Sequence, residues 1–123
     1  MTAALPAAGG ISIHAVDVAH GVPAGGLEVR LRRLSPDAAE IAAGICAKNG
    51  HSLHPVSEGK GVTRGLYEVT FGVSAYYRAS VLELPDPAFV EDAVLSFGID
   101  RVSEHFHIPF KFTPGGSLFR DGA

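Results

Sequence analysis

Short segments of alternating apolar and polar residues, separated by turns rich in glycine and proline, recur along this chain. Alternation places every second side chain on one face, which is typical of a β-strand with one buried face. Residues 11–17, 27–32 and 66–71 are predicted strands, residues 97–100 end a further one, and residues 101–113 begin the last clear one. Many short strands joined by frequent turns predict a sandwich of β-sheets.

Helical signals are few. Ser35 followed by Pro36 is typical of a helix start, with serine as the N-cap and proline in the first turn. The next stretch, residues 41–46, fits either a strand or a helix, and residues 75–82 are expected to hold one short helix. Asn49 and Gly50 predict a tight turn.

Size and charge limit the classes of function. A chain of 123 residues is expected to form one domain, and 46% hydrophobic residues suffice for one core. Ten basic residues against 13 acidic ones give a net charge of -3, so nothing favours binding to nucleic acid or to an anionic membrane. The single cysteine, Cys46, excludes a disulfide within the chain.

The first ten residues are rich in alanine, proline and glycine and are expected to form a flexible leader before a domain over residues 11–123. They lack the charged and apolar regions of a signal peptide. No apolar run approaches the roughly 20 residues that a membrane helix needs. We therefore expect a cytoplasmic protein without a membrane partner.

The segment 104–114 carries the clearest chemical signal. In a strand, its apolar side chains would face the core, namely Phe106, Ile108, Phe110 and Phe112. His105, His107 and Lys111 would project from the opposite face. Two imidazoles on a face that is not part of the core can exchange protons near neutral pH, so they form a plausible catalytic pair; a solvated polar face is the alternative.

The other histidines are ambiguous by themselves. His14 lies opposite the apolar face of the first strand, while His51 and His54 follow the predicted turn and His20 occupies another turn. A solvated or structural role is the simpler interpretation for each. A metal site built from His105 and His107 with His14 or His51 is conceivable, but no Glu or Cys stands at a recognisable ligand spacing, and we predict no metal.

Several motifs resemble the transthyretin and 5-hydroxyisourate hydrolase family, in the family's order. Residues 11–17 and 20–24 are similar to its Ser-Thr-His-Val-Leu-Asp and Gly-Xaa-Pro-Ala motifs. Residues 65–71 resemble its central strand, residues 75–78 the start of its single short helix, and residues 104–109 its signature Glu-His-Tyr-His-Val-Pro. The resemblance runs from about residue 11 to the C-terminus.

The resemblance implies an all-β, transthyretin-like sandwich of two antiparallel sheets with one short helix. It also implies a homotetramer, arranged as a dimer of dimers, with active sites at subunit interfaces. Members of the family hydrolyse a lactam bond of 5-hydroxyisourate without a metal or organic cofactor. Their two key histidines correspond to His14 and His107, and the first histidine of the signature corresponds to His105.

Two departures from the family's pattern fall on positions of chemical importance. His51 stands where the family has an arginine after a turn, and a histidine cannot reproduce the two-pronged, permanently charged guanidinium. Phe119 and Arg120 occupy the positions of the family's terminal Tyr-Arg, and the Gly-Ser that follows this pair in the family is lost in this chain.

The sequence thus predicts a hydrolase that opens the ring of a urate-derived or related heterocycle by histidine-assisted attack of water. The predicted catalytic residues are His14, His51 and His107. The predicted substrate-binding residues are Ser12, His105, Phe119 and Arg120. The alternatives are an enzyme for a different lactam or lactone, and a non-catalytic binding or assembly module.

Overall fold

The structure is a computed structural model that describes residues 10–52, 62–80 and 83–119. The predicted leader, His54 and Arg120 fall outside the described residues, except for Gly10 of the leader. The elements, in chain order, are β1 (Ile11–Asp17), β2 (Val22–Pro23), β3 (Glu28–Ser35), β4 (Ala39–Ile45), β5 (Gly65–Phe71), α1 (Val73–Ala79), β6 (Ala93–Ile99), β7 (Phe106–Thr113) and β8 (Gly116–Phe119).

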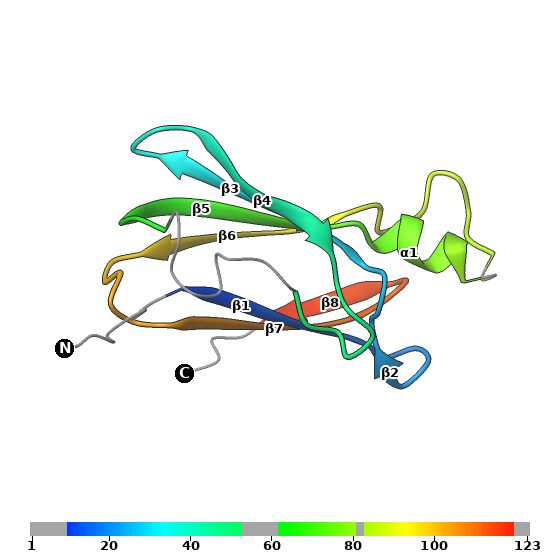
Figure 1. The fold of residues 1–123 in the computed structure, drawn as a ribbon. Coiled ribbons are helices and arrows are strands. Elements are labelled where there is room, and N and C mark those ends of the chain that lie inside the picture. Colours follow the sequence, from blue (N-terminus) through cyan, green and yellow to red (C-terminus); the bar gives the residue numbers. More distant parts are fainter. Residues whose placement is uncertain (1–9, 53–61, 81–82, 120–123) are drawn as a thin grey trace.

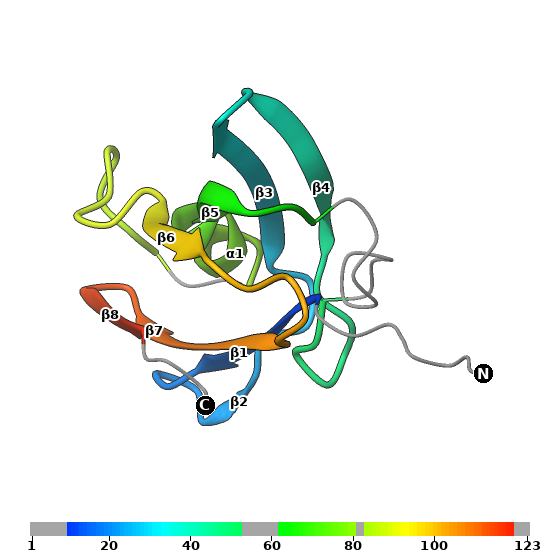
Figure 2. The same cartoon turned by 90° about the vertical axis from the view of Figure 1, so that its left-hand side faces the viewer.

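The strands form two sheets that face each other, which confirms the predicted sandwich (Figures 1 and 2). One sheet has the order β2-β1-β7-β8 and the other the order β4-β3-β5-β6. Figure 1 shows α1 at one end of the sandwich. Among the described residues, no helix has the length and apolar character required to cross a membrane.

One pairing differs from the expected antiparallel arrangement. β1 and β7 run parallel, with Ile11 opposite Phe106 and Asp17 opposite Phe112, so the first sheet is mixed. The remaining pairs of neighbouring strands are antiparallel. Alternation within a strand indicates which face is buried but carries no information on the direction of the neighbouring strand, and for this reason the parallel pair was not predicted.

The predicted helix start at Ser35 and Pro36 is wrong. Ser35 ends β3, Pro36 lies in the bend that follows, and the ambiguous segment after it is the strand β4. The fixed φ of proline suits a turn as well as a helix start, and pairing with β3 gives the backbone of β4 its hydrogen-bond partners. The predicted short helix is confirmed as α1, which begins two residues earlier than expected.

The core lies between the sheets and is joined by aromatic rings. Alternate residues of β1 are buried, and in β7 the buried side chains include Ile108, Phe110 and Phe112, as predicted. Phe106, which was predicted to face the core with them, is partly buried and packs against it. Phe71 of the second sheet stacks on Phe110 of the first, with ring centroids 3.9 Å apart. Phe110 stacks in turn on Phe112 at 4.8 Å. These ring contacts join the two sheets. The even-numbered side chains of β1 lie on the outer face of the sheet.

A buried carboxylate fastens α1 to the end of β1. Asp17 is completely buried and accepts hydrogen bonds from the hydroxyls of Tyr77 (2.6 Å) and Tyr76 (3.0 Å) and from Nδ1 of His20 (2.6 Å). Burial favours the neutral carboxyl, but these hydrogen bonds outweigh it and hold the pKa of Asp17 below its ordinary value. Burial and the nearby Asp17 raise the pKa of Tyr76 to about 12. His20 therefore has a structural partner in Asp17.

Candidate active site

The register of β1 against β7 brings the first set of site residues together. Ser12 lies opposite His107, and His14 lies opposite Pro109. Because side chains alternate along a strand, Ser12 and His14 share the outer face of the sheet. Both are partly buried there, between the buried Ile11, Ile13 and Ala15.

Ser12 joins two histidines. Its hydroxyl oxygen lies 2.7 Å from Nδ1 of His107 and 2.8 Å from Nε2 of His105. His107 is partly buried, whereas His105, which precedes β7, is exposed. Three polar side chains from opposite ends of the chain thus form one hydrogen-bonded group.

The turn after β4 supplies a further histidine. The amide of Ala15 donates to the carbonyl of Gly50 (2.9 Å) and the amide of Ser52 donates to the carbonyl of Ile13 (3.1 Å), so this segment lies beside β1. His51 is consequently bridged to His14, and the two rings stack with centroids 4.4 Å apart and planes 19° from parallel.

Gly50 allows this close approach. Its φ of +83° lies in the left-handed region, and a Cβ built there would lie 2.4 Å from the carbonyl oxygen of Ala15 and 3.2 Å from the ring of His14. The turn predicted from Asn49 and Gly50 is confirmed, and its glycine is required both for backbone conformation and for space.

The surroundings of His107 favour its uncharged form. Partial burial lowers the pKa of His107, and the positive charges that His14, His51 and His105 acquire lower it further. Nε2 of His14 donates to the carbonyl oxygen of Asn49 (3.0 Å), because a carbonyl only accepts. The neutral His14 ring therefore carries its lone pair on Nδ1. A neutral imidazole with a free lone pair can accept a proton from water.

The structure brings together five of the predicted site residues, Ser12, His14, His51, His105 and His107. Phe119 ends β8, opposite Phe110 on β7. Lys111 is exposed and follows His107 at a same-face position on β7, as predicted. Asn49 was not singled out as a site residue, although its carbonyl orients His14; the Asn-Gly turn was the available signal.

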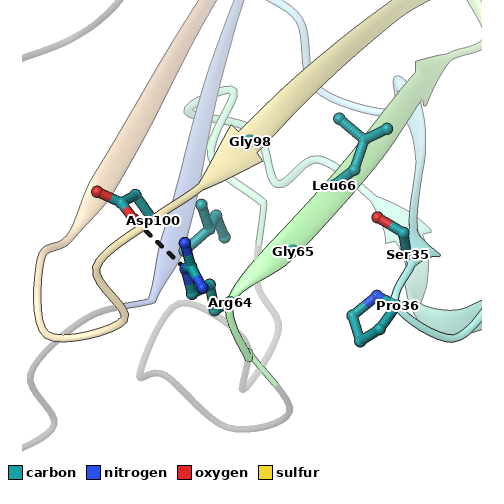
Figure 3. A pocket seen from close by; sticks show the side chains of 8 residues that line it. Ser35, Pro36, Arg64, Gly65, Leu66, Gly98 and Asp100 are labelled. Atoms are coloured by element: carbon teal, nitrogen blue, oxygen red, sulfur yellow. Dashed lines mark hydrogen bonds and ion pairs between the residues drawn. The ribbon is translucent and has the colours of Figure 1, made fainter.

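One surface hollow is lined by residues other than these histidines. This hollow has a volume of about 700 Å³ and lies between the Ser35–Pro36 bend and the ends of β5 and β6. Figure 3 shows its lining, in which Arg64 and Asp100 form an exposed ion pair. Its described lining contains no histidine. Within residues 10–52, 62–80 and 83–119, no group of three or more His, Cys, Asp or Glu side chains is arranged to hold a metal ion.

Comparisons with known proteins agree with the resemblance. The chain is 36% identical over 107 residues to the 5-hydroxyisourate hydrolase of Pseudomonas aeruginosa, covering 86% of this chain and 85% of that protein. It is 38% identical over 109 residues to the 5-hydroxyisourate hydrolase 2 of Rhizobium meliloti, covering 88% and 91%. These relatives support the predicted hydrolase.

Solved structures share the fold. The 5-hydroxyisourate hydrolase of Klebsiella pneumoniae superposes with a TM-score of 0.76 at 25% identity, covering 94% of both chains. A structure of (S)-allantoin synthase superposes with a TM-score of 0.85 at 28% identity, covering 94% of this chain but only 44% of that one. The model of the HIUase/Transthyretin family matches residues 11–120. This chain therefore belongs to the HIUase/Transthyretin family.

Proposed function

We propose that this protein hydrolyses 5-hydroxyisourate, opening its ring at a lactam bond by histidine-assisted attack of water. The observation that carries the proposal is the group of four imidazoles and one hydroxyl that β1, β7 with the residue before it, and the turn after β4 bring together. The names of the relatives at 36% and 38% identity supply the substrate.

In the proposed reaction, Nε2 of His107 accepts a proton from water while the water oxygen bonds to the lactam carbon. The carbon–nitrogen bond then breaks, and the leaving nitrogen takes up a proton, so that a carboxylate and an amine-type nitrogen result. The lowered pKa of His107 supports its role as the base, because its neutral form then prevails at neutral pH. His14, whose lone pair lies on Nδ1, is the second proton carrier.

The oxygen that becomes negative in this reaction needs hydrogen-bond donors. His51 is the proposed donor beside His14, and it gives one N–H where a guanidinium would give two. His105, Phe119 and Arg120 are proposed to hold the substrate. Ser12 was included in this group on the sequence alone, but its two hydrogen bonds to histidines favour a different role.

The direct test is to generate 5-hydroxyisourate from urate with a uricase and to follow the decay of its absorbance with and without this protein. We expect clear acceleration over spontaneous decay. His107→Ala should reduce the rate constant by about 10²- to 10⁴-fold, the usual contribution of a positioned base.

His20→Gln is the matched control, because His20 is paired with Asp17 outside the site. Circular dichroism should first show that this variant is folded, and its activity should then equal that of the wild type. If wild-type protein fails to accelerate the decay, or if His107→Ala and wild-type protein have equal rates, the proposed reaction is wrong.

A second candidate is hydrolysis of a different lactam or of a lactone. His51 favours it, since its ring stacks on His14 and changes the donor set offered to the substrate. This second candidate would be supported if folded protein is inactive on 5-hydroxyisourate but opens other cyclic amides or esters. That activity should be lost in His107→Ala.

We further propose that the protein acts as a homotetramer in the cytoplasm. Ser12, His14 and His107 are only partly buried on the outer face, and the half-exposed Val18 and Val22 adjoin the same sheet. Covering this face would remove water from the site. Sedimentation equilibrium should give four times the mass of 12.8 kDa; a monomer at micromolar concentration would contradict this.

A further inference from the structure

The hydroxyl of Ser12 contacts two imidazole nitrogens at once, and the proposed attack of water uses neither contact. Its oxygen lies 2.7 Å from Nδ1 of His107 and 2.8 Å from Nε2 of His105. Both distances are those of well-formed hydrogen bonds. The side chain lies on the outer face of β1, so the packing of the core does not require a hydroxyl at this position.

The chemistry of the three groups restricts how the protons are distributed. A serine hydroxyl has one proton to donate and two lone pairs, and a neutral imidazole has one N–H and one lone pair. His107 can act as a base through Nε2 only if its own proton is on Nδ1. Nδ1 then donates to the oxygen of Ser12, and the hydroxyl proton of Ser12 is left to donate to Nε2 of His105.

We propose that Ser12 is a positioning residue that fixes His107 in the tautomer with its proton on Nδ1, with His105 as the acceptor that orients the hydroxyl. This role rests on the proposed function, in which His107 is the base. The same arrangement remains satisfied after His107 has accepted a proton on Nε2, because Nδ1 still donates to Ser12. The hydrogen-bonded group therefore suits both protonation states of the reaction and requires no rearrangement between them.

The fold explains why Ser12 is well placed for this role. The parallel register puts its Cα directly opposite that of His107, and the two side chains project from the same face. His105 lies two residues earlier, at the entry to β7, where its ring reaches the same oxygen from the exposed side. One hydroxyl at this position thus contacts both rings.

The test compares Ser12→Ala with Ser12→Thr. Long-range ¹H–¹⁵N NMR spectra of ¹⁵N-histidine-labelled protein, recorded above the pKa of His107, report which ring nitrogen carries the proton. We expect the proton on Nδ1 in the wild type and in Ser12→Thr. In Ser12→Ala we expect a shift toward the Nε2–H tautomer that free histidine prefers. On 5-hydroxyisourate, kcat should fall about 10- to 100-fold in Ser12→Ala, with KM little changed, and Ser12→Thr should restore most of it.

The NMR measurement separates the two proposals. A wild-type His107 with its proton on Nε2, or the same tautomer in wild type and Ser12→Ala, would overturn the role of Ser12 whatever the activity is. A protein inactive on 5-hydroxyisourate whose His107 nevertheless changes tautomer in Ser12→Ala would refute the proposed substrate and support the role of Ser12. An active wild type with an equally active Ser12→Ala variant would overturn the inference.

Discussion

Individual nitrogen atoms determine what each histidine of the site can do. The carbonyl of Asn49 fixes the proton of His14 on Nε2, so this ring offers Nδ1 as its base. The hydroxyl of Ser12 meets His107 at Nδ1, so the second ring has Nε2 on the side away from the serine. Two neighbouring imidazoles therefore present opposite nitrogens, and they are not interchangeable.

The pH dependence of activity follows from the neutral state of His107. Its pKa lies below the ordinary 6.5, because of burial and of the neighbouring histidines. The neutral form is the proposed base, so kcat/KM should rise with pH and reach half of its maximum below pH 6.5. His51→Ala removes one positive neighbour and should move this midpoint upward. A wild-type midpoint above 6.5 would contradict the assignment of His107 as the base.

Asp17 is expected to contribute strongly to stability. Asp17→Asn removes a buried charge that accepts bonds from Tyr76, Tyr77 and His20, and should lower the free energy of unfolding by about 2–4 kcal/mol. Since its folded pKa lies below the unfolded value, this contribution is complete above about pH 4 and is lost as the pH falls through the folded pKa. Urea unfolding at several pH values measures both effects.

Asp100→Asn is the control for this prediction, because its carboxylate is 80% exposed and forms only a surface ion pair with Arg64. It should change the free energy of unfolding by less than about 1 kcal/mol. Equal losses in both variants would show that the bonds to Asp17 do not have the expected strength.

At the scale of elements, the alternating pattern predicted most strands but not their partners. The alternation in residues 11–17 indicated which side chains are buried, and β1 has that pattern. The helix start at Ser35 was wrong because the local signal of serine and proline is shared by turns, and the pairing partner decided the outcome. β8 was not identified as a separate strand, since only four residues pair with β7.

The site could likewise be predicted only in part, because alternation does not show which segments lie side by side. His14 and His107 were singled out through the motifs, and alternation placed them on the outer face. The stacking of His51 on His14 and the bridge through Ser12 depend on the alignment of β1 with the turn and with β7. Such alignments join distant segments, and a pattern within one segment does not specify them.

The turn before His51 gives a prediction at this scale. Gly50→Ala forces a left-handed conformation on alanine and places a Cβ against Ala15, so the segment must move away from β1. We expect a loss of about 1–3 kcal/mol in the free energy of unfolding and a drop in kcat, because His51 leaves His14. Gly44→Ala in β4 is the control, since no heavy atom lies within 4 Å of its Cβ. Equal stability and activity of the two variants would refute the role of Gly50.

At the scale of the whole molecule, the packing of the two sheets is expected to depend on the stacking of Phe71 on Phe110. Phe110→Ala removes the ring that stacks on Phe71 across the core and should cost about 3–5 kcal/mol of unfolding free energy. Thermal and denaturant unfolding should detect this loss together with loss of activity. Val102→Ala, at a half-exposed turn position, should change stability by less than about 0.5 kcal/mol. A small effect of Phe110→Ala would mean that the sheets are held mainly by other contacts.

The parallel pairing of β1 with β7 has a consequence for how the protein is made. The ribosome releases β1 first, yet the strand that supplies its long pairing, and with it His107, emerges only after β2 to β6 and α1 have been synthesised. Until then, of the pairings that β1 makes within the described part of the chain, those with the short β2 and with residues 50–52 can form, but the one with β7 cannot. A nascent chain interrupted before Phe106 would carry Ser12, His14, His51 and His105 but neither His107 nor the strand that follows His105, so premature termination would abolish the site instead of weakening it.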